Sequence, residues 1–194
     1  MVATPHPRHH RHARRGFSIV ELIVALVLVG LIASFAVPRV NYEKFRAEAA
    51  MRVVRGALQS AQRNAIMRQT NMVVAFNTTT PRVEIIEDTN NNCSLDTGER
   101  VSVRPLEDGA KFAIPPSGYG GTTVTTPVTG PALCTIHGLQ AIQFLRDGAT
   151  STDLDIYITS SRATKTHFRL IRVAQASGRT EAMRFDGTTW QRTN

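Results

Sequence analysis

The hydrophobic and polar positions divide the chain into an apolar run, an amphipathic segment and a series of short alternating segments. Between residues 17 and 37 the only charged side chain is Glu21. This run of about 21 residues matches the ~20 that a helix needs to cross a bilayer. We therefore predict a membrane-spanning helix over residues 17–38.

Residues 39–70 show a helical period with apolar residues on one side and charged residues on the other. The apolar positions recur at steps of four, with others widening the stripe: Phe45, Ala49, Val53, Ala57, Ala61 and Ala65, then Val54, Leu58 and Ile66. Pro38 removes a backbone donor and is predicted to kink the helix rather than end it. The pattern predicts one long helix whose second half covers another layer.

From residue 71 the chain changes to short β-branched and aromatic runs, several of them alternating with polar residues. The predicted strands are residues 72–76, 83–87, 101–106, 112–114, 141–145, 154–158, 168–173 and 181–185. Alternation buries one face of a sheet, and the helix stripe is a suitable cover. The predicted fold class is α+β, a long N-terminal helix packed on an antiparallel sheet. Residues 115–131, rich in Gly, Pro, Thr and Ser, are predicted to form a surface loop.

A basic stub precedes the apolar run and contains Arg8, Arg11, Arg14, Arg15 and four histidines. The formal charge is +8, and +4 remains when these arginines are left out. Basic residues of this kind keep the stub in the cytoplasm, which places the rest of the chain outside. A carboxylate near the start of a membrane segment is costly, so Glu21 requires a compensating partner or a functional reason.

The segment Gly16-Phe17-Ser18-Ile19-Val20-Glu21-Leu22 resembles the class III signal of type IV prepilins and type II secretion pseudopilins. The family pattern has Glu at mature position 5 and Pro at mature position 22, which are Glu21 and Pro38 here. The resemblance implies cleavage after Gly16 by a prepilin peptidase and N-methylation of Phe17. It implies a helix that anchors the subunit in the inner membrane and later packs in a filament, where Glu21 pairs with a neighbour's N-terminal amine.

The rest of the chain resembles the H-type pseudopilin and FimT/FimU minor pilin family. The resemblance rests on residues 58–68 running into 73–76, a Phe144-x-x-Asp147-Gly148 turn, and a strand pair joined around Ser177-Gly178-Arg179. It implies a leader (1–16), a membrane and filament-core helix (17–38), an amphipathic half (39–70) and a periplasmic β-rich domain (71–194). The implied function is a non-enzymatic subunit that initiates or caps a type IV pilus or a secretion pseudopilus. The implied partners are other pilin subunits, the peptidase and an inner-membrane assembly platform.

Two other interpretations of the N-terminus are open. Ser34-Phe35-Ala36 offers the small-x-small cleavage site of a secretory signal, although the apolar region of such a signal usually has ~7 to 15 residues and no acid. An ordinary single-pass anchor would not need the spacing of Gly16, Glu21 and Pro38 together. The prepilin interpretation explains all three residues.

Cys93 and Cys134 both lie in the part predicted to be exported. A periplasm would oxidise them and close a loop of about 40 residues. Two unpaired buried thiols are the alternative. Zinc is not expected, because His137 is the only candidate ligand near either cysteine and no four-ligand spacing appears.

Residues 88–99 match much of a twelve-residue calcium loop. The oxygen ligands at positions one, three, five, nine and twelve are Asp88, Asn90, Asn92, Asp96 and Glu99. Cys93 stands at position six, where the turn favours glycine, and no helix flanks the loop. Because Asn and Asp also form turns by themselves, a polar hairpin loop without a metal is the favoured interpretation.

Residues 162–194 contain seven basic and two acidic residues with aromatic residues between them, a composition that suits phosphate backbones. The candidate contacts are Lys165, Arg169, Arg179 and Arg184. DNA-receptor pilins of the FimT type carry Gly-Arg-x-Arg, but Glu181 replaces the second arginine after Gly178-Arg179 here. A DNA-binding minor pilin for DNA uptake is therefore the alternative function, and arginines on the polar side of strands are the ordinary explanation.

The sequence offers little for catalysis. His137 and His167 are isolated, and neither a nucleophile elbow nor a phosphate-binding glycine loop appears. Both histidines are predicted on turns or at the surface. We expect no enzyme activity and no cofactor.

Overall fold

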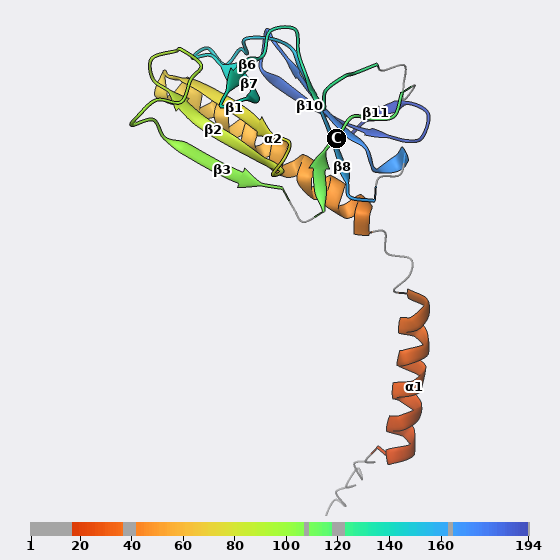
Figure 1. Cartoon of the computed structure of the whole chain (residues 1–194). Coiled ribbons are helices and arrows are strands. Elements are labelled where there is room, and N and C mark those ends of the chain that lie inside the picture. The colour runs from red at the N-terminus through yellow and green to blue at the C-terminus, as the bar shows by residue number, and fades with distance from the viewer. Residues whose placement is uncertain (1–16, 37–41, 107–108, 118–122, 163–164, 194) are drawn as a thin grey trace, which may run out of the picture. The chain divides into compact units, whose positions relative to one another are not determined.

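The computed structural model describes residues 17–36, 42–106, 109–117, 123–162 and 165–193 (Figure 1). The chain divides into two units, Met1–Asn41 and Tyr42–Asn194. The predicted leader, Gly16 and Pro38 lie outside the described residues. The structure describes α1 (Ile19–Ala36) in the first unit and α2 (Tyr42–Arg68) in the second. The predicted kink at Pro38 falls between them, outside the described residues, and stays a prediction.

In the first unit, Ser18 precedes α1 and its Oγ accepts a hydrogen bond from the backbone N–H of Val20 over 3.3 Å. The helix is apolar on all sides and carries Glu21 in its first turn. Within the described residues, no helix combines the length and the apolar character required to cross a membrane. The membrane-spanning helix over residues 17–38 therefore stays a prediction.

In the second unit, α2 buries one side. Its buried residues are Ala47, Ala50, Met51, Val54, Ala57, Leu58, Ala61 and Ala65. The predicted stripe is confirmed from Val54 to Ala65 but wrong at its ends, where Phe45 is 65% and Ile66 is 44% exposed. A strict step of four drifts by about 40° per step around a helix of 3.6 residues per turn, so it leaves the buried side.

The first sheet is antiparallel and has the order β3-β2-β1-β7-β6. Its strands are β1 (Asn71–Asn77), β2 (Arg82–Asp88), β3 (Val101–Pro105), β6 (Cys134–Ile136) and β7 (Leu139–Phe144). The second sheet has the order β11-β10-β9-β8-β4, and β5 also pairs with β8. Its elements are β4 (Ala110–Phe112), β5 (Val128–Thr129), β8 (Leu154–Ser160), β9 (Arg169–Ala174), β10 (Arg179–Phe185) and β11 (Trp190–Arg192), with the 3-10 turn η3 (Lys165–His167) before β9.

Seven of the eight predicted strands are present, but the strands belong to two sheets and not to one. The eighth, predicted over residues 112–114, shares only Phe112 with β4. Three strands were not predicted, namely β5, β6 and β11, which have only two or three residues each. Strands this short carry too few positions for alternation to be recognised. β5 also lies inside the stretch predicted to be a surface loop.

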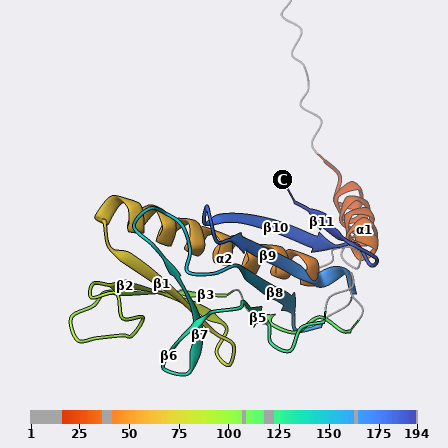
Figure 2. The same cartoon turned by 90° about the horizontal axis from the view of Figure 1, so that it is seen from above.

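Both sheets pack against α2, which runs along them (Figures 1 and 2). One apolar core joins Val54, Leu58 and Ala61 to residues of both sheets. The side-chain amide of Gln62 donates to the carbonyls of Gly148 and Ser177, each over 2.8 Å. α2 thereby joins the turn after β7 to the turn before β10, which are the two glycine turns of the family resemblance.

The outer face of the first sheet has its own cover. Val73, Ala75 and Ile86 are buried there, and Cys93 and Leu95 from the loop after β2 pack against them. The Cys93–Cys134 disulfide is formed, which confirms its prediction. The disulfide joins this loop to β6 and holds it over the sheet.

Candidate functional site

The N-terminal segment is the first candidate site. Phe17 is 82% exposed, and Glu21 lies exposed in the first turn of α1. Ser18 and Glu21 have the Ser-x-x-Glu spacing of a capping box, a signal that the sequence analysis missed. A carboxylate in the first turn is also stabilised by the helix dipole. Glu21 makes no ion pair with any of the described residues.

The side chains of α1 are unusual for a protein in water. Its large apolar side chains between Ile19 and Ile32 are 51% to 79% exposed. A helix that is apolar all round is normally covered by a protein core or by lipid. Within its own unit α1 has no such cover.

The second candidate is the calcium-like loop at residues 88–99. Asp88 is buried, and its carboxylate accepts the backbone N–H groups of Asn92 (3.1 Å) and Cys93 (2.9 Å). The side-chain amide of Gln143 on β7 donates to the same carboxylate over 2.9 Å. Asp88 thus ties the start of the loop to the first sheet.

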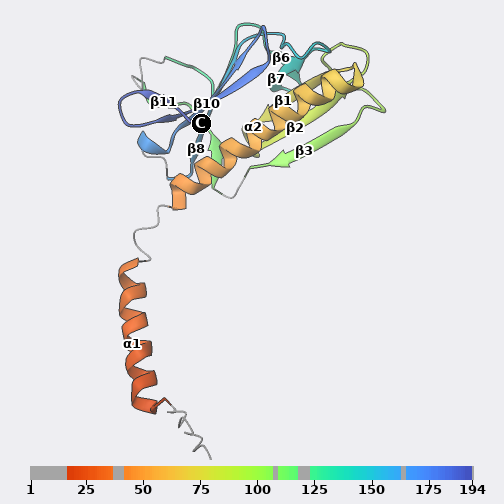
Figure 3. The same cartoon turned by 180° about the vertical axis from the view of Figure 1, so that it is seen from behind.

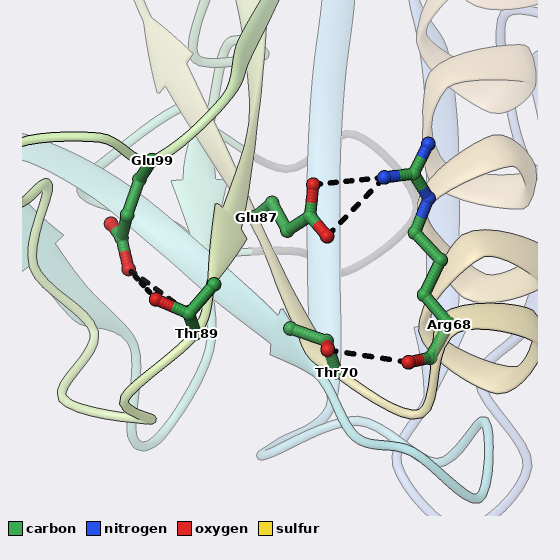
Figure 4. A network of polar contacts seen from close by, with 5 residues as sticks. All are labelled: Arg68, Thr70, Glu87, Thr89 and Glu99. Atoms are coloured by element: carbon green, nitrogen blue, oxygen red, sulfur yellow. Dashed lines mark hydrogen bonds and ion pairs between the residues drawn. The ribbon is translucent and has the colours of Figure 1, made fainter.

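The other two carboxylates are also engaged within the loop. Asp96 accepts the side-chain amides of Asn90 and Asn92, each over 2.7 Å, and these bonds lower its pKa. Glu99 accepts the backbone N–H groups of Thr89 (2.9 Å) and Asp96 (3.1 Å) and the Thr89 hydroxyl (3.2 Å) (Figure 4). The oxygens expected to bind calcium are therefore the acceptors that hold the loop together.

Cys93 adopts a left-handed conformation with φ of 53°. The backbone thus takes the turn that a calcium loop requires at position six, although glycine is absent. Among the described residues, no group of three or more His, Cys, Asp or Glu side chains is arranged to hold a metal. Calcium binding stays a prediction, and the loop's own hydrogen bonds favour the metal-free hairpin.

The third candidate, the basic C-terminal region, does not form one patch. Arg169 was expected at the surface, but its side chain is 1% exposed and donates to Glu48 on α2 over 3.0 Å. Arg179 and Arg184 are both exposed. Five positions separate them in the regular strand β10, so they point to opposite faces of the sheet. Lys165 lies in η3.

The outer face of the second sheet carries arginines that are paired with carboxylates across β8 to β11. Arg172 contacts Asp155 through two bonds of 2.8 Å, and this carboxylate raises the pKa of the guanidinium. Glu181 lies 3.1 Å from Arg192 and 3.9 Å from Arg179. Glu181 therefore compensates the arginine that the DNA hypothesis relies on most.

The histidines and hollows give no catalytic constellation within the described residues. His137 is exposed in a turn with φ of 49°. His167 is buried at the end of the 3-10 turn η3, so the prediction of a turn position holds for it although its side chain is not at the surface. A hollow of about 610 Å³ is lined by Asp153 and Asp155, among other residues. Asp153 accepts the Gln175 backbone N–H over 2.8 Å and Asp155 is paired with Arg172, so both carboxylates are engaged.

Comparison with known families identifies the N-terminal segment. Residues 11–37 match the family model described as the prokaryotic N-terminal methylation motif. The chain therefore carries a prepilin-type signal, as predicted from Gly16, Phe17 and Glu21, and it is pilin-like in this segment. No curated protein matches the chain.

Two solved structures are similar to the chain, both of the minor pseudopilin EpsH from the type II secretion system of Vibrio cholerae. The first is 12% identical, covers 71% of this chain and 94% of its own, and gives a TM-score of 0.45. The second is 12% identical, covers 78% and 99%, and gives a TM-score of 0.48. A likeness this weak assigns no function.

Proposed function

We propose that the chain is a non-enzymatic minor pilin or pseudopilin subunit that helps to initiate or cap a filament assembled at the bacterial inner membrane. The observation that carries the proposal is the methylation motif at residues 11–37, which includes the whole of the apolar helix α1. The exposed apolar side chains of α1 support it, because such a helix requires lipid or other helices around it. The globular unit would lie in the periplasm, where its disulfide is stable.

In this proposal a prepilin peptidase cuts between Gly16 and Phe17, and the new amine of Phe17 is methylated. Glu21, which has no ion-pair partner among the described residues, then pairs with the Phe17 amine of a neighbouring subunit in the filament. That pair would offset the cost of burying a carboxylate among apolar helices. It would also fix the axial position of one subunit against the next, and Pro38 would let the helix bend where it leaves the apolar layer.

The first test is mass spectrometry of the N-terminus of the protein purified from membranes. We expect a mature chain that begins at methylated Phe17. A mature chain that begins at Val37, after Ser34-Phe35-Ala36, would show a secretory signal and would refute the proposal.

The second test compares Glu21→Gln with Glu21→Asp in a strain that assembles the filament. The glutamine variant keeps the size and loses the charge, so we expect membrane insertion without incorporation into filaments. The aspartate variant keeps the charge and should retain part of the incorporation. Equal incorporation of both variants would show that the carboxylate has a local role only, such as capping α1 with Ser18.

A type IV pilus and a type II secretion pseudopilus share the properties used above. Crosslinking of the chain in the membrane, followed by identification of its partners, separates the two machines. Recovery of secretion-machine subunits would indicate the pseudopilus, and recovery of pilus subunits would indicate the type IV pilus. In either case the assembly platform should be recovered as well.

The exposed side chain of Arg179 keeps DNA uptake as the second candidate function. If the chain takes part in DNA uptake, its binding to duplex DNA should weaken as the salt concentration rises and should be reduced by Arg179→Gln.

Calcium binding is tested by calorimetry on the full chain in detergent. A heat of binding that Asp96→Asn abolishes would establish a calcium site. We propose no cofactor for the assembly function.

A further inference from the structure

β3 forms one end of the first sheet. Within the described residues it pairs with β2 alone, and its other edge faces no strand (Figures 1 and 3). An edge of this kind presents unpaired backbone groups and is a template for a further strand.

The register shows which backbone groups are free. The N–H of Glu87 donates to the carbonyl of Arg100 over 3.0 Å, and the N–H of Leu106 donates to Pro81 in the same register. Hydrogen-bonded and non-bonded pairs alternate in antiparallel strands, so Ser102 and Arg104 direct their backbone groups toward β2. Val101 and Val103 therefore direct their N–H and carbonyl groups outward.

The side chains of β3 alternate in the same way. Ser102 and Arg104 lie opposite Ile85 and Val83, which belong to the core under α2, so they share the face toward that helix. Val101 and Val103 lie on the other face, where they are 41% and 45% exposed.

Between β3 and the end of α2 there is a hollow of about 300 Å³. Its lining includes the side chains of Asn64, Arg68, Glu87, Arg100, Ser102 and Arg104. Arg68 reaches from α2 to Glu87 on β2 over 3.0 Å, which neutralises both charges (Figure 4). Arg100 and Arg104 form no ion pair with the described residues, so the hollow carries an excess of positive charge.

We propose that β3 accepts an extended segment of another protein as an added strand, and that this segment alternates acidic and apolar side chains. Its backbone would pair with the outward groups of Val101 and Val103. Its acidic side chains would enter the hollow beside Arg100 and Arg104, and its apolar side chains would cover the two valines. This surface is separate from α1 and does not depend on the assembly function proposed above.

A second copy of the chain fits this edge poorly. If two β3 strands paired, the arginines of one copy would line the same face as those of the other, and like charges side by side are unfavourable. The basic residues and Pro105 at the edge thus oppose pairing between two copies of β3. They do not oppose pairing of β3 with an acidic strand from another protein. Nucleic acid offers phosphates for the arginines but no peptide groups for the outward N–H and carbonyl groups.

The test uses the full chain in detergent micelles and an eight-residue peptide with blocked ends that alternates Glu and Val. Amide hydrogen exchange is followed by NMR. We expect the peptide to slow exchange at Val101 and Val103 by about tenfold or more, because only these β3 amides gain a partner. Ser102 and Arg104 already donate to β2 and should not change. An unchanged exchange rate at both valines would overturn the proposal.

Two variants separate backbone pairing from charge. Val103→Pro removes one outward donor and spares the pairing with β2, so it should abolish peptide binding. The double variant Arg100→Glu with Arg104→Glu should weaken the Glu-Val peptide by about tenfold or more, the effect of losing two exposed ion pairs. It should bind a Lys-Val peptide in its place.

Arg184→Glu on β10 is the matched control for charge and should bind the Glu-Val peptide like the unmodified chain. Glu21→Gln should also leave binding unchanged, which separates this proposal from filament assembly. Equal binding of the Glu-Val and Lys-Val peptides to the unmodified chain would contradict the charge argument. If the chain forms concentration-dependent dimers that Val103→Pro abolishes, the occupant of the edge is a second copy of the chain. If the chain binds DNA and the double variant abolishes this binding, the occupant is DNA.

Discussion

α1 and α2 differ in how their apolar residues are covered within their own units: α2 buries one side, whereas the large apolar side chains of α1 are exposed. α2 alternates apolar and charged positions, so one side has an advantage in burial and packs on two sheets. α1 has a single charge among its residues and no preferred side, and its large apolar side chains stay exposed. The difference shows that an amphipathic helix has a side that its own unit can bury, whereas a helix that is apolar all round has no preferred side.

The glutamates of the two helices show the same contrast. Glu48 on α2 accepts from Arg169 over 3.0 Å, and Arg169 also donates to the carbonyls of Thr166 and Phe168. Glu21 on α1 has no ion-pair partner among the described residues. One carboxylate thus has a role inside the fold, whereas the role proposed for the other lies between chains.

The largest expected effect comes from removing Glu48. Glu48→Ala leaves the buried Arg169 charge without its partner, which should cost about 3 to 5 kcal/mol of the free energy of unfolding. Denaturant unfolding of the full chain in detergent measures it through the fluorescence of Trp190, the only tryptophan, which contacts Tyr157 and Phe185. Glu21→Ala is the control and should not move this transition. Similar losses for both variants would remove the contrast between the glutamates.

A pair of leucines tests the helices themselves. Leu58 in α2 is fully buried, so Leu58→Ala should cost about 2 to 5 kcal/mol through lost burial and the cavity that remains. Leu28 in α1 is 54% exposed, and Leu28→Ala should leave the Trp190 transition unchanged. A shift of the same size with Leu28→Ala would mean that α1 packs on the globular unit.

The disulfide should have an effect of similar size that is confined to the globular unit. Replacing both Cys93 and Cys134 by alanine removes a crosslink over 41 positions, and we expect a loss of about 3 to 4 kcal/mol in the chain-entropy model. Reducing agent added to the unmodified chain should give the same shift and should have no further effect on the double variant. A stable double variant would show that the hydrogen bonds of Asp88 hold the loop alone.

The smallest effect concerns an exposed charge, in contrast to the partly buried Glu48. Backbone N–H groups of Thr189 and Thr188 lower the pKa of Asp186 from 3.8 to about 2. A carboxyl whose pKa is lowered on folding stabilises the folded state above its unfolded pKa. This contribution disappears as the pH falls from about 4 to about 2. The pH dependence of unfolding in this range should flatten slightly in Asp186→Asn.

Local sequence patterns were sufficient to predict individual strands and the buried side of α2, but not the pairing of strands or the burial of Arg169. The seven longer strands and the middle of the α2 stripe follow from alternation and helical period, which are local. The division into two sheets depends on pairing between distant segments, such as β1 with β7, which no single window reveals. Arg169 was misplaced because its burial requires Glu48, 121 positions away in the sequence.

The sequence by itself determined the prepilin-type signal, because Gly16, Phe17 and Glu21 form a linear motif that a peptidase would meet in an extended or membrane-bound segment. It also determined the α+β class and the two cysteines, whose pairing the structure confirmed. Only the tertiary structure showed that the calcium-like loop uses its carboxylates to bind itself, and that Arg179 and Arg184 face opposite ways. The register of β3 was also visible only there, because the direction of a backbone N–H depends on the strand beside it.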